Sequence, residues 1–291
     1  HLLTFCRRPS ARRFPRKGGR SMTELLSSVF SLTVMRYALI VGVPIALCAA
    51  LLGVLLVLRR YAMIGDGLSH VGFGALSVAY ALNLAPMAVA VPVVILAAFL
   101  LLGLSGSRKL RGDSAIAVLS SSALALGVVA NSLAGGSATD LNGYLFGSIL
   151  TLTRADVILS VSLSAVVILL FVLFKNRIFA VTFDEPFAKS AGVRVGLYNG
   201  LLALLIAVTV VVGMRIVGTM LISSLIIFPA LGAMQLAGSF RGVVLLSALI
   251  SVVSFLCGLL FSMTLPAGAT IVLCNLAALL ICTVLGKVIK H

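Results

Sequence analysis

Two residues with metal-binding side chains, Asp66 and His70, lie four positions apart in an otherwise apolar segment. On an α-helix this spacing places both side chains on one face, about 6 Å apart along the axis. A carboxylate oxygen and a neutral imidazole nitrogen form part of a ligand set for a divalent transition metal. Ionisable groups at membrane depth are costly, and they mark ion or substrate pathways. If this segment is a membrane helix, the pair therefore indicates a pathway for a metal ion.

The same pair also fits a structural role at the start of a helix. If the helix begins near Leu68, Asp66 is an N-cap at the membrane surface and His70 is a packed helix residue. Arg59 and Arg60 mark that surface, and Arg60 lies only about 9 Å from Asp66 along a helix. The local sequence leaves both interpretations open. One chain also offers only two good ligands here, whereas two symmetric copies would offer four.

The composition indicates a protein that crosses a membrane several times. Of 291 residues, 61% are hydrophobic and only 10% are charged, against roughly 25% charged in soluble domains. The apolar runs are about 20 residues long and lack strand-like alternation, which favours helices over a barrel. We therefore expect an all-α polytopic membrane protein with about nine transmembrane helices, eight being the alternative. The expected spans are Tyr37–Leu58, Ala62–Asn83, Pro86–Leu104, Ser114–Ala134, Ala155–Phe174, Val195–Gly213, Val217–Ala237, Val243–Met263 and Ala267–Leu285.

The net charge of +15 reflects orientation in a lipid bilayer rather than binding to nucleic acid. Basic residues gather in short loops between apolar runs, where they mark the cytoplasmic side. If the region before Tyr37 is outside, far more basic residues of the spans and loops lie inside than outside. The inside residues are Arg59, Arg60, Arg108, Lys109, Arg111, Lys175, Arg177, Lys189, Arg194, Arg241, Lys287 and Lys290, and the outside residues are Arg36, Arg154 and Arg215. This arrangement predicts a cytoplasmic C-terminus.

The first 21 residues are rich in arginine and would lie on the outer side, which basic segments avoid. We expect residues 1–21 to be a disordered basic tail, or an extension upstream of a natural start at Met22. Residues 22–291 are expected to form a single transmembrane domain.

A polar segment between two late spans, 175–194, contains a short predicted helix. Asp184 is a suitable N-cap, and Gly192 suits the C-terminal end. The helix would present Phe187 on one face. Two interpretations remain open: the segment docks on a cytosolic partner, or it is an ordinary cytosolic loop with a helical turn. The residues of this candidate coupling segment are Asp184, Glu185, Pro186, Phe187, Ala188, Lys189, Ser190, Ala191 and Gly192.

A second candidate pathway element is a proline inside the span that follows Gly218. Pro229 removes a backbone hydrogen bond and is expected to kink this helix. Two interpretations are open: the kink is purely structural, or the broken helix lines the pathway of the transported ion.

Motifs for autonomous catalysis and for ATP binding are absent from the sequence. There is no H-E-x-x-H zinc-protease motif and no G-x-S-x-G nucleophile elbow. Gly286-Lys287 is not a phosphate-binding loop, because no glycine stands five residues earlier and Val288 replaces the Ser or Thr. We therefore expect the chain not to be an enzyme, and any ATP-driven role needs a separate ATPase.

Three motifs, taken in order and spacing, resemble those of a known family. The segment 59–70 is similar to its basic loop followed by a G-D-x-L-[SA]-H signature. The segment 145–150 is similar to its L-F-G-x-[IL]-L motif, and 218–230 to its G-x-[LM]-L…P-A helix. The family is the integral-membrane permease of zinc and manganese uptake ABC transporters. The resemblance extends from about Met22 to the C-terminus.

The resemblance implies a homodimeric permease in the bacterial inner membrane, working with two cytosolic ABC ATPase subunits and an extracytoplasmic metal-binding protein. It implies that Asp66 and His70 are ligands in the metal pathway and that the coupling segment contacts the ATPase. The expected cargo is Zn²⁺ or Mn²⁺, which these ligand types do not distinguish. No cofactor is expected to bind permanently, and ATP is expected to bind the partner subunit.

Two other transport functions remain open on the sequence. A related permease for iron chelates or cobalamin shares the architecture but needs a wide pathway without an intramembrane Asp–His pair. An ion-coupled secondary carrier would work without any ATPase. An intramembrane enzyme fits poorly, because the catalytic motifs named above are missing.

Overall fold

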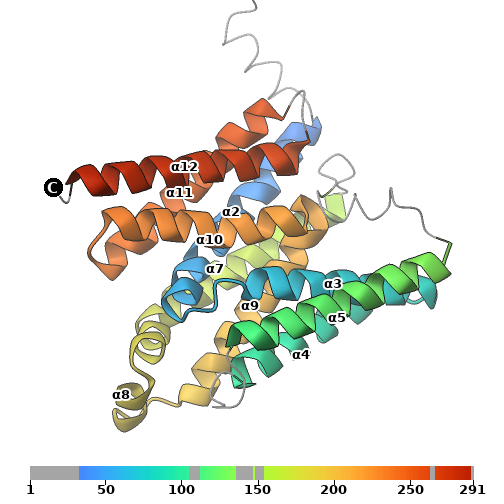
Figure 1. Ribbon diagram of the computed structural model, residues 1–291, viewed down its shortest axis with the longest axis horizontal. Helices are drawn as coiled ribbons and strands as arrows, with labels where there is room; N and C mark the ends of the chain where they lie inside the picture. Colours follow the sequence, from blue (N-terminus) through green and yellow to red (C-terminus); the bar gives the residue numbers. More distant parts are fainter. Residues whose placement is uncertain (1–32, 105–111, 136–146, 148–153, 263–265, 290–291) are drawn as a thin grey trace, which may run out of the picture.

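The computed structural model describes residues 33–104, 112–135, 147, 154–262 and 266–289. Within these residues the chain forms ten helices and no strand (Figure 1), which confirms the expected all-α class. The helices are α2 (Thr33–Leu58), α3 (Ile64–Ala81), α4 (Pro86–Leu104), α5 (Gly112–Leu133), α7 (Arg154–Phe183), α8 (Glu185–Ser190), α9 (Val195–Val217), α10 (Thr219–Leu236), α11 (Phe240–Phe261) and α12 (Ala267–Ile289).

Eight helices of the described chain are long and apolar enough to cross a membrane, so the protein is an all-α polytopic membrane protein. They are α2, α4, α5, α7, α9, α10, α11 and α12. The ninth expected span corresponds to α3, which is 18 residues long and carries Asp66, His70 and several glycines. These residues lower its hydrophobicity, and eight is therefore the number that length and composition support.

The largest departure from the expected boundaries is in α7. The apolar run predicted a span ending at Phe174, but the helix has 30 residues and continues to Phe183. No glycine or proline interrupts residues 175–183, and Ile178 and Val181 are buried in the core. A helix of this length extends about 45 Å, which exceeds the roughly 30 Å apolar core of a bilayer.

The helix α3 packs between several neighbours, and its glycines allow close approach. It contacts α4, α5, α9 and α10. A Cβ atom at Gly65 would meet the Ile226 side chain of α10, and one at Gly74 would meet the backbone of Ala123 in α5. The absence of side chains at these two positions therefore sets where α3 lies in the bundle.

The first turn of α3 lies beside the N-terminal half of α10. Ile226, the residue of α10 that meets Gly65, is the eighth of 18 residues in that helix. The start of α3 therefore lies alongside a helix that is long and apolar enough to cross a membrane.

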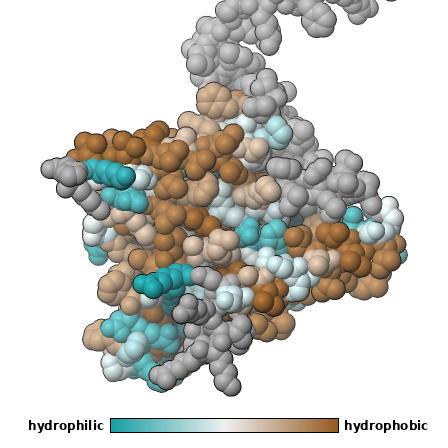
Figure 2. All heavy atoms as spheres, in the orientation of Figure 1, coloured by the Kyte–Doolittle hydropathy of each residue, from teal (hydrophilic) through white to brown (hydrophobic). Residues whose placement is uncertain are grey.

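The visible surface divides into apolar and polar regions. Figure 2 shows hydrophobic atoms over α10, α12 and α5, and a hydrophilic patch around α8. Large apolar side chains are exposed along the long helices, with Leu126 of α5 and Leu245 of α11 as examples. This distribution suits helices that face lipid and a short α8 that lies outside it.

Several positions that carried sequence predictions lie outside the described residues. They include the basic tail at 1–21, the predicted inner-side residues Arg108, Lys109, Arg111 and Lys290, and most of the motif at 145–150, of which only Gly147 is described. Gly147 has a positive φ of 72°, and a Cβ atom there would collide with the backbone of Val217 and Gly218. The glycine of this motif therefore packs against the junction of α9 and α10.

Candidate metal-pathway site

Asp66 and His70 both lie within the first two turns of α3. The helix begins at Ile64, and Met63 occupies the N-cap position without a side-chain cap. The alternative in which the helix begins near Leu68 and Asp66 caps it is therefore wrong.

The two side chains approach each other as the four-residue spacing predicts. The His70 Nε2 atom lies 3.5 Å from Asp66 Oδ2. The side chains are 19% and 34% exposed, respectively, so the pair opens onto one face of the chain. His70 Nδ1 is buried and has no hydrogen-bond partner among the described residues. Through Nε2, the imidazole is thus in contact with the carboxylate of Asp66.

A third polar group reaches the pair from α10. Ser223 Oγ lies 3.2 Å from Asp66 Oδ1 and 3.0 Å from the carbonyl oxygen of Thr219. A hydroxyl has one proton and two lone pairs. When the proton is donated to the Thr219 carbonyl, the lone pairs of Ser223 face the carboxylate. Two electron-rich oxygens in contact repel each other, and a cation beside them removes that repulsion.

The position of Ser223 within α10 shows which part of that helix the site adjoins. It is the fifth residue of a helix that ends thirteen residues later at Leu236, which is about 20 Å along the axis. Asp66 contacts Ser223, and therefore lies within the length of a helix that can span a membrane. Charged groups at such depth are retained where they line a path or bind a partner.

The ligand set within one chain is small. The described residues contain no group of three or more His, Cys, Asp or Glu side chains that could hold a metal ion. Asp66 and His70 supply one carboxylate and one imidazole, and Ser223 adds a hydroxyl oxygen. A tetrahedral site for a transition metal normally has four such ligands.

Ser223 was not among the residues that the sequence singled out. Its only local signal is a hydroxyl inside an apolar span, and such hydroxyls commonly bond their own helix backbone. The contact with Asp66 joins residues 157 positions apart, so only the packing of α3 against α10 reveals it.

Pro229 is buried in α10, and the helix continues through it to Leu236. It follows Ser223 by six residues, which places the two side chains on different faces of the helix. The interruption between helices occurs instead at Gly218, where φ is 96° and ψ is 158°. A role for Pro229 in the pathway stays a prediction.

The candidate coupling segment forms the expected short helix. Asp184 Oδ1 accepts a hydrogen bond of 2.9 Å from the backbone N–H of Phe187, as an N-cap does. Gly192 follows the helix with a φ of 78°, a conformation that glycine adopts without strain. Ala188 is buried, whereas Phe187 is 65% exposed. The segment therefore presents an aromatic ring to the solvent beyond the end of α7.

Comparison with known proteins identifies the family to which this chain belongs. Residues 31–286 match the model of the ABC 3 transport family. The chain belongs to this family. The resemblance drawn from the three sequence motifs is thereby confirmed, and this ABC 3 protein is similar to permease subunits of ABC transporters.

Similar proteins include one named for manganese import and one named for zinc uptake. The ABC 3 protein is 30% identical over 252 residues to the manganese import system permease protein ScaB of Streptococcus gordonii, covering 86% of this chain and 90% of that protein. It is 28% identical over 237 residues to the high-affinity zinc uptake system membrane protein ZnuB of Buchnera aphidicola, covering 80% and 91%.

A solved structure shares the fold of this ABC 3 protein. It is that of PsaBC from Streptococcus pneumoniae in complex with Fab, with a TM-score of 0.78 and 30% sequence identity. The match covers 89% of this chain and 94% of that chain. The helical arrangement described above is therefore one that occurs in a solved protein of similar sequence.

Proposed function

We propose that the chain is the membrane permease subunit of an ATP-driven importer of a divalent transition metal, Zn²⁺ or Mn²⁺. The observation that carries the proposal is the meeting of Asp66, His70 and Ser223 inside the helical bundle. Carboxylate, imidazole and hydroxyl groups suit both metals, and similar proteins are named as manganese or zinc permeases. The ion is held in passing, tightly enough for selection and weakly enough for release.

We infer that the working site is shared between two copies of the chain. One copy provides too few ligands for a tetrahedral metal site, and its pair is open on one face. A symmetric second copy facing this pair would double the ligand set. This proposal predicts a homodimer in which the two α3 helices approach each other near Asp66.

The energy for transport is assigned to a separate cytosolic ATPase. The sequence contains no phosphate-binding loop of the G-x-x-x-x-G-K-[ST] type. The exposed Phe187 on α8 is the feature that supports docking of such a subunit. An extracytoplasmic metal-binding protein would deliver the ion on the other side, and the C-terminus would be cytoplasmic.

The central experiment measures metal uptake by Asp66→Ala and His70→Ala variants in vesicles that contain the assembled transporter. We expect both variants to assemble and to lose uptake of Mn²⁺ and Zn²⁺. Ser77→Ala is a matched control, because Ser77 is a buried polar residue further along α3. Wild-type uptake by the Asp66 and His70 variants would refute the site.

Two further measurements separate the alternatives. Uptake of iron chelates or cobalamin in preference to free ion would favour the related chelate permease. Transport in liposomes that contain this chain without an ATPase would favour a secondary carrier. For the coupling helix, Phe187→Ala should weaken binding to the ATPase, whereas Leu133→Ala, an exposed apolar change at the end of α5, should not.

A further inference from the structure

A charged side chain in the turn between α2 and α3 bonds to the end of α7. Arg59 follows α2 directly, and its Nε atom donates a hydrogen bond of 3.1 Å to Thr182 Oγ1. Thr182 lies in the last turn of α7, two residues before Asp184, the N-cap of α8. The bond thus joins segments 123 residues apart in the sequence.

The backbone around Arg59 is a hydrogen-bonded turn and not a loose connection. Arg59 N–H donates to Leu55 O at 3.1 Å, and Tyr61 N–H donates to Leu56 O at 2.9 Å. Arg60 between them adopts a φ of 61°, the left-handed conformation that ends many helices. Tyr61 O in turn accepts from the N–H of Ile64 at 3.1 Å.

This series of bonds runs from α2 into the first turn of α3, where Asp66 lies two residues after Ile64. A short, hydrogen-bonded segment therefore connects Arg59 to the helix of the proposed metal site.

The side chain of Arg59 lies in a partly buried environment with an acidic residue nearby. The residue is half-buried, and burying a guanidinium group is unfavourable unless it is paired. Burial lowers the pKa of Arg59 from its ordinary value, and the nearby Glu185 carboxylate of α8 opposes this shift. Arg59 thus interacts with Thr182 at the end of α7 and with Glu185 at the start of α8.

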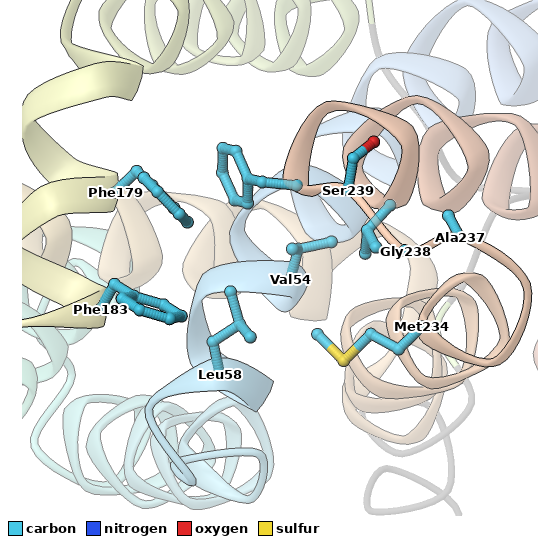
Figure 3. A pocket seen from close by; sticks show the side chains of 10 residues that line it. Val54, Leu58, Phe179, Phe183, Met234, Ala237, Gly238 and Ser239 are labelled. Atoms are coloured by element: carbon cyan, nitrogen blue, oxygen red, sulfur yellow. The ribbon is translucent and has the colours of Figure 1, made fainter.

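An apolar cavity of about 210 Å³ adjoins this contact. Figure 3 shows Phe179 and Phe183 of α7 on one side of it and Met234 of α10 on the other. Leu58, which precedes Arg59, also lines the cavity, as does Phe183, which follows Thr182. The end of α7 therefore borders a partly open apolar pocket, which leaves room for α7 to shift.

We propose that Arg59 is a positioning residue that transmits movement of α8 and the end of α7 to the Asp66–His70 pair. This proposal rests on the proposed function, since it assumes that α8 docks on an ATPase. ATP binding and hydrolysis move α8, the Arg59–Thr182 contact carries the movement into the turn before α3, and the ligand pair shifts. Loss of the contact leaves each site intact but separates ATP hydrolysis from transport.

The test compares four single variants in vesicles containing the full transporter with its ATPase and metal-binding protein. Arg59→Met removes the charge and the N–H donor, and Thr182→Val removes the acceptor while keeping the shape of the side chain. Thr182→Ser keeps the acceptor, and Arg60→Gln removes an exposed charge from the same turn. The measured quantities are Mn²⁺ or Zn²⁺ transported per ATP hydrolysed, basal ATPase rate, metal affinity and amount of assembled complex.

We expect Arg59→Met and Thr182→Val to keep assembly, basal ATPase rate and metal affinity. Metal transported per ATP should fall roughly fivefold or more, the lower limit of a typical coupling between sites. Thr182→Ser and Arg60→Gln should remain close to the wild type. The double variant Arg59→Met/Thr182→Val should be no worse than either single variant, because both changes remove the same contact.

Wild-type transport per ATP in an assembled Thr182→Val variant would overturn the proposal. Loss of assembly by Arg59→Met together with normal transport by Thr182→Val would also overturn it, because Arg59 would then be only structural. These outcomes differ from failure of the proposed function, in which the wild-type chain itself would not transport metal or bind the ATPase.

Discussion

Replacing Ser223 by alanine tests whether the hydroxyl from α10 belongs to the metal site. The variant removes one oxygen that lies 3.2 Å from Asp66 Oδ1 and leaves the backbone of α10 unchanged. If Ser223 turns its lone pairs toward the ion, Ser223→Ala loses one metal–oxygen contact. If Ser223 only donates a proton to Asp66, its loss makes the carboxylate a stronger base, and metal binding is unchanged or tighter.

The size of the effect follows from the shared geometry of this hydroxyl. A hydrogen bond or polar contact to a charged group contributes about 1.5–3 kcal/mol. Ser223 divides its interactions between Asp66 and the Thr219 carbonyl, and Asp66 is 34% exposed, so the lower part of this range applies. We expect a loss of about 1–2 kcal/mol in metal binding, or roughly 5- to 30-fold in affinity.

The assay is direct titration of the purified, assembled protein with Zn²⁺ and with Mn²⁺. Ser224→Ala is the matched control, because Ser224 is the adjacent residue, is buried and bonds its own helix at Leu221 O. An affinity of Ser223→Ala equal to or tighter than that of Ser224→Ala would refute the assignment of Ser223 as a ligand. That outcome would leave Asp66 and His70 as the ligands that the described residues offer to the site.

The remaining predictions concern packing and the coupling helix. Gly74→Ala should lower the stability of the protein by about 1–3 kcal/mol, since the added methyl group meets the backbone of Ala123. Thermal unfolding in detergent checks this, with Gly103→Ala as the control because nothing lies within 4 Å of its Cβ position; equal melting temperatures would contradict the packing. Asp184→Ala should destabilise α8 by about 1 kcal/mol through loss of its N-cap, and Asp184→Asn should not. Hydrogen exchange at the Phe187 amide measures this, and unchanged protection in Asp184→Ala would argue against the cap.

Local sequence patterns were sufficient for features that depend on residues close together in the chain. The spacing of Asp66 and His70 predicted that they meet, and they lie 3.5 Å apart. The N-cap at Asp184 and the glycine stop at Gly192 predicted α8, because capping is decided within one or two turns. Apolar runs predicted most of the spans, because crossing a bilayer requires a minimum length of apolar helix.

Boundaries were less predictable where polar residues continue a helix. The end of α7 was expected at Phe174, yet the helix reaches Phe183. Hydropathy locates the part of a helix that lies in lipid, but it does not locate the end of a helix that extends beyond it. Burial of Ile178 and Val181 by other helices supports the additional turns.

The sequence by itself determined that this protein is a bundle of membrane helices with one acid–imidazole pair and no G-x-x-x-x-G-K-[ST] motif. Only the tertiary structure decided the contact of that pair with Ser223 and the bond from Arg59 to Thr182. These contacts join residues more than 100 positions apart, and no local periodicity encodes them. They depend on how closely whole helices approach, which is set by where glycines leave room for a neighbouring backbone or side chain.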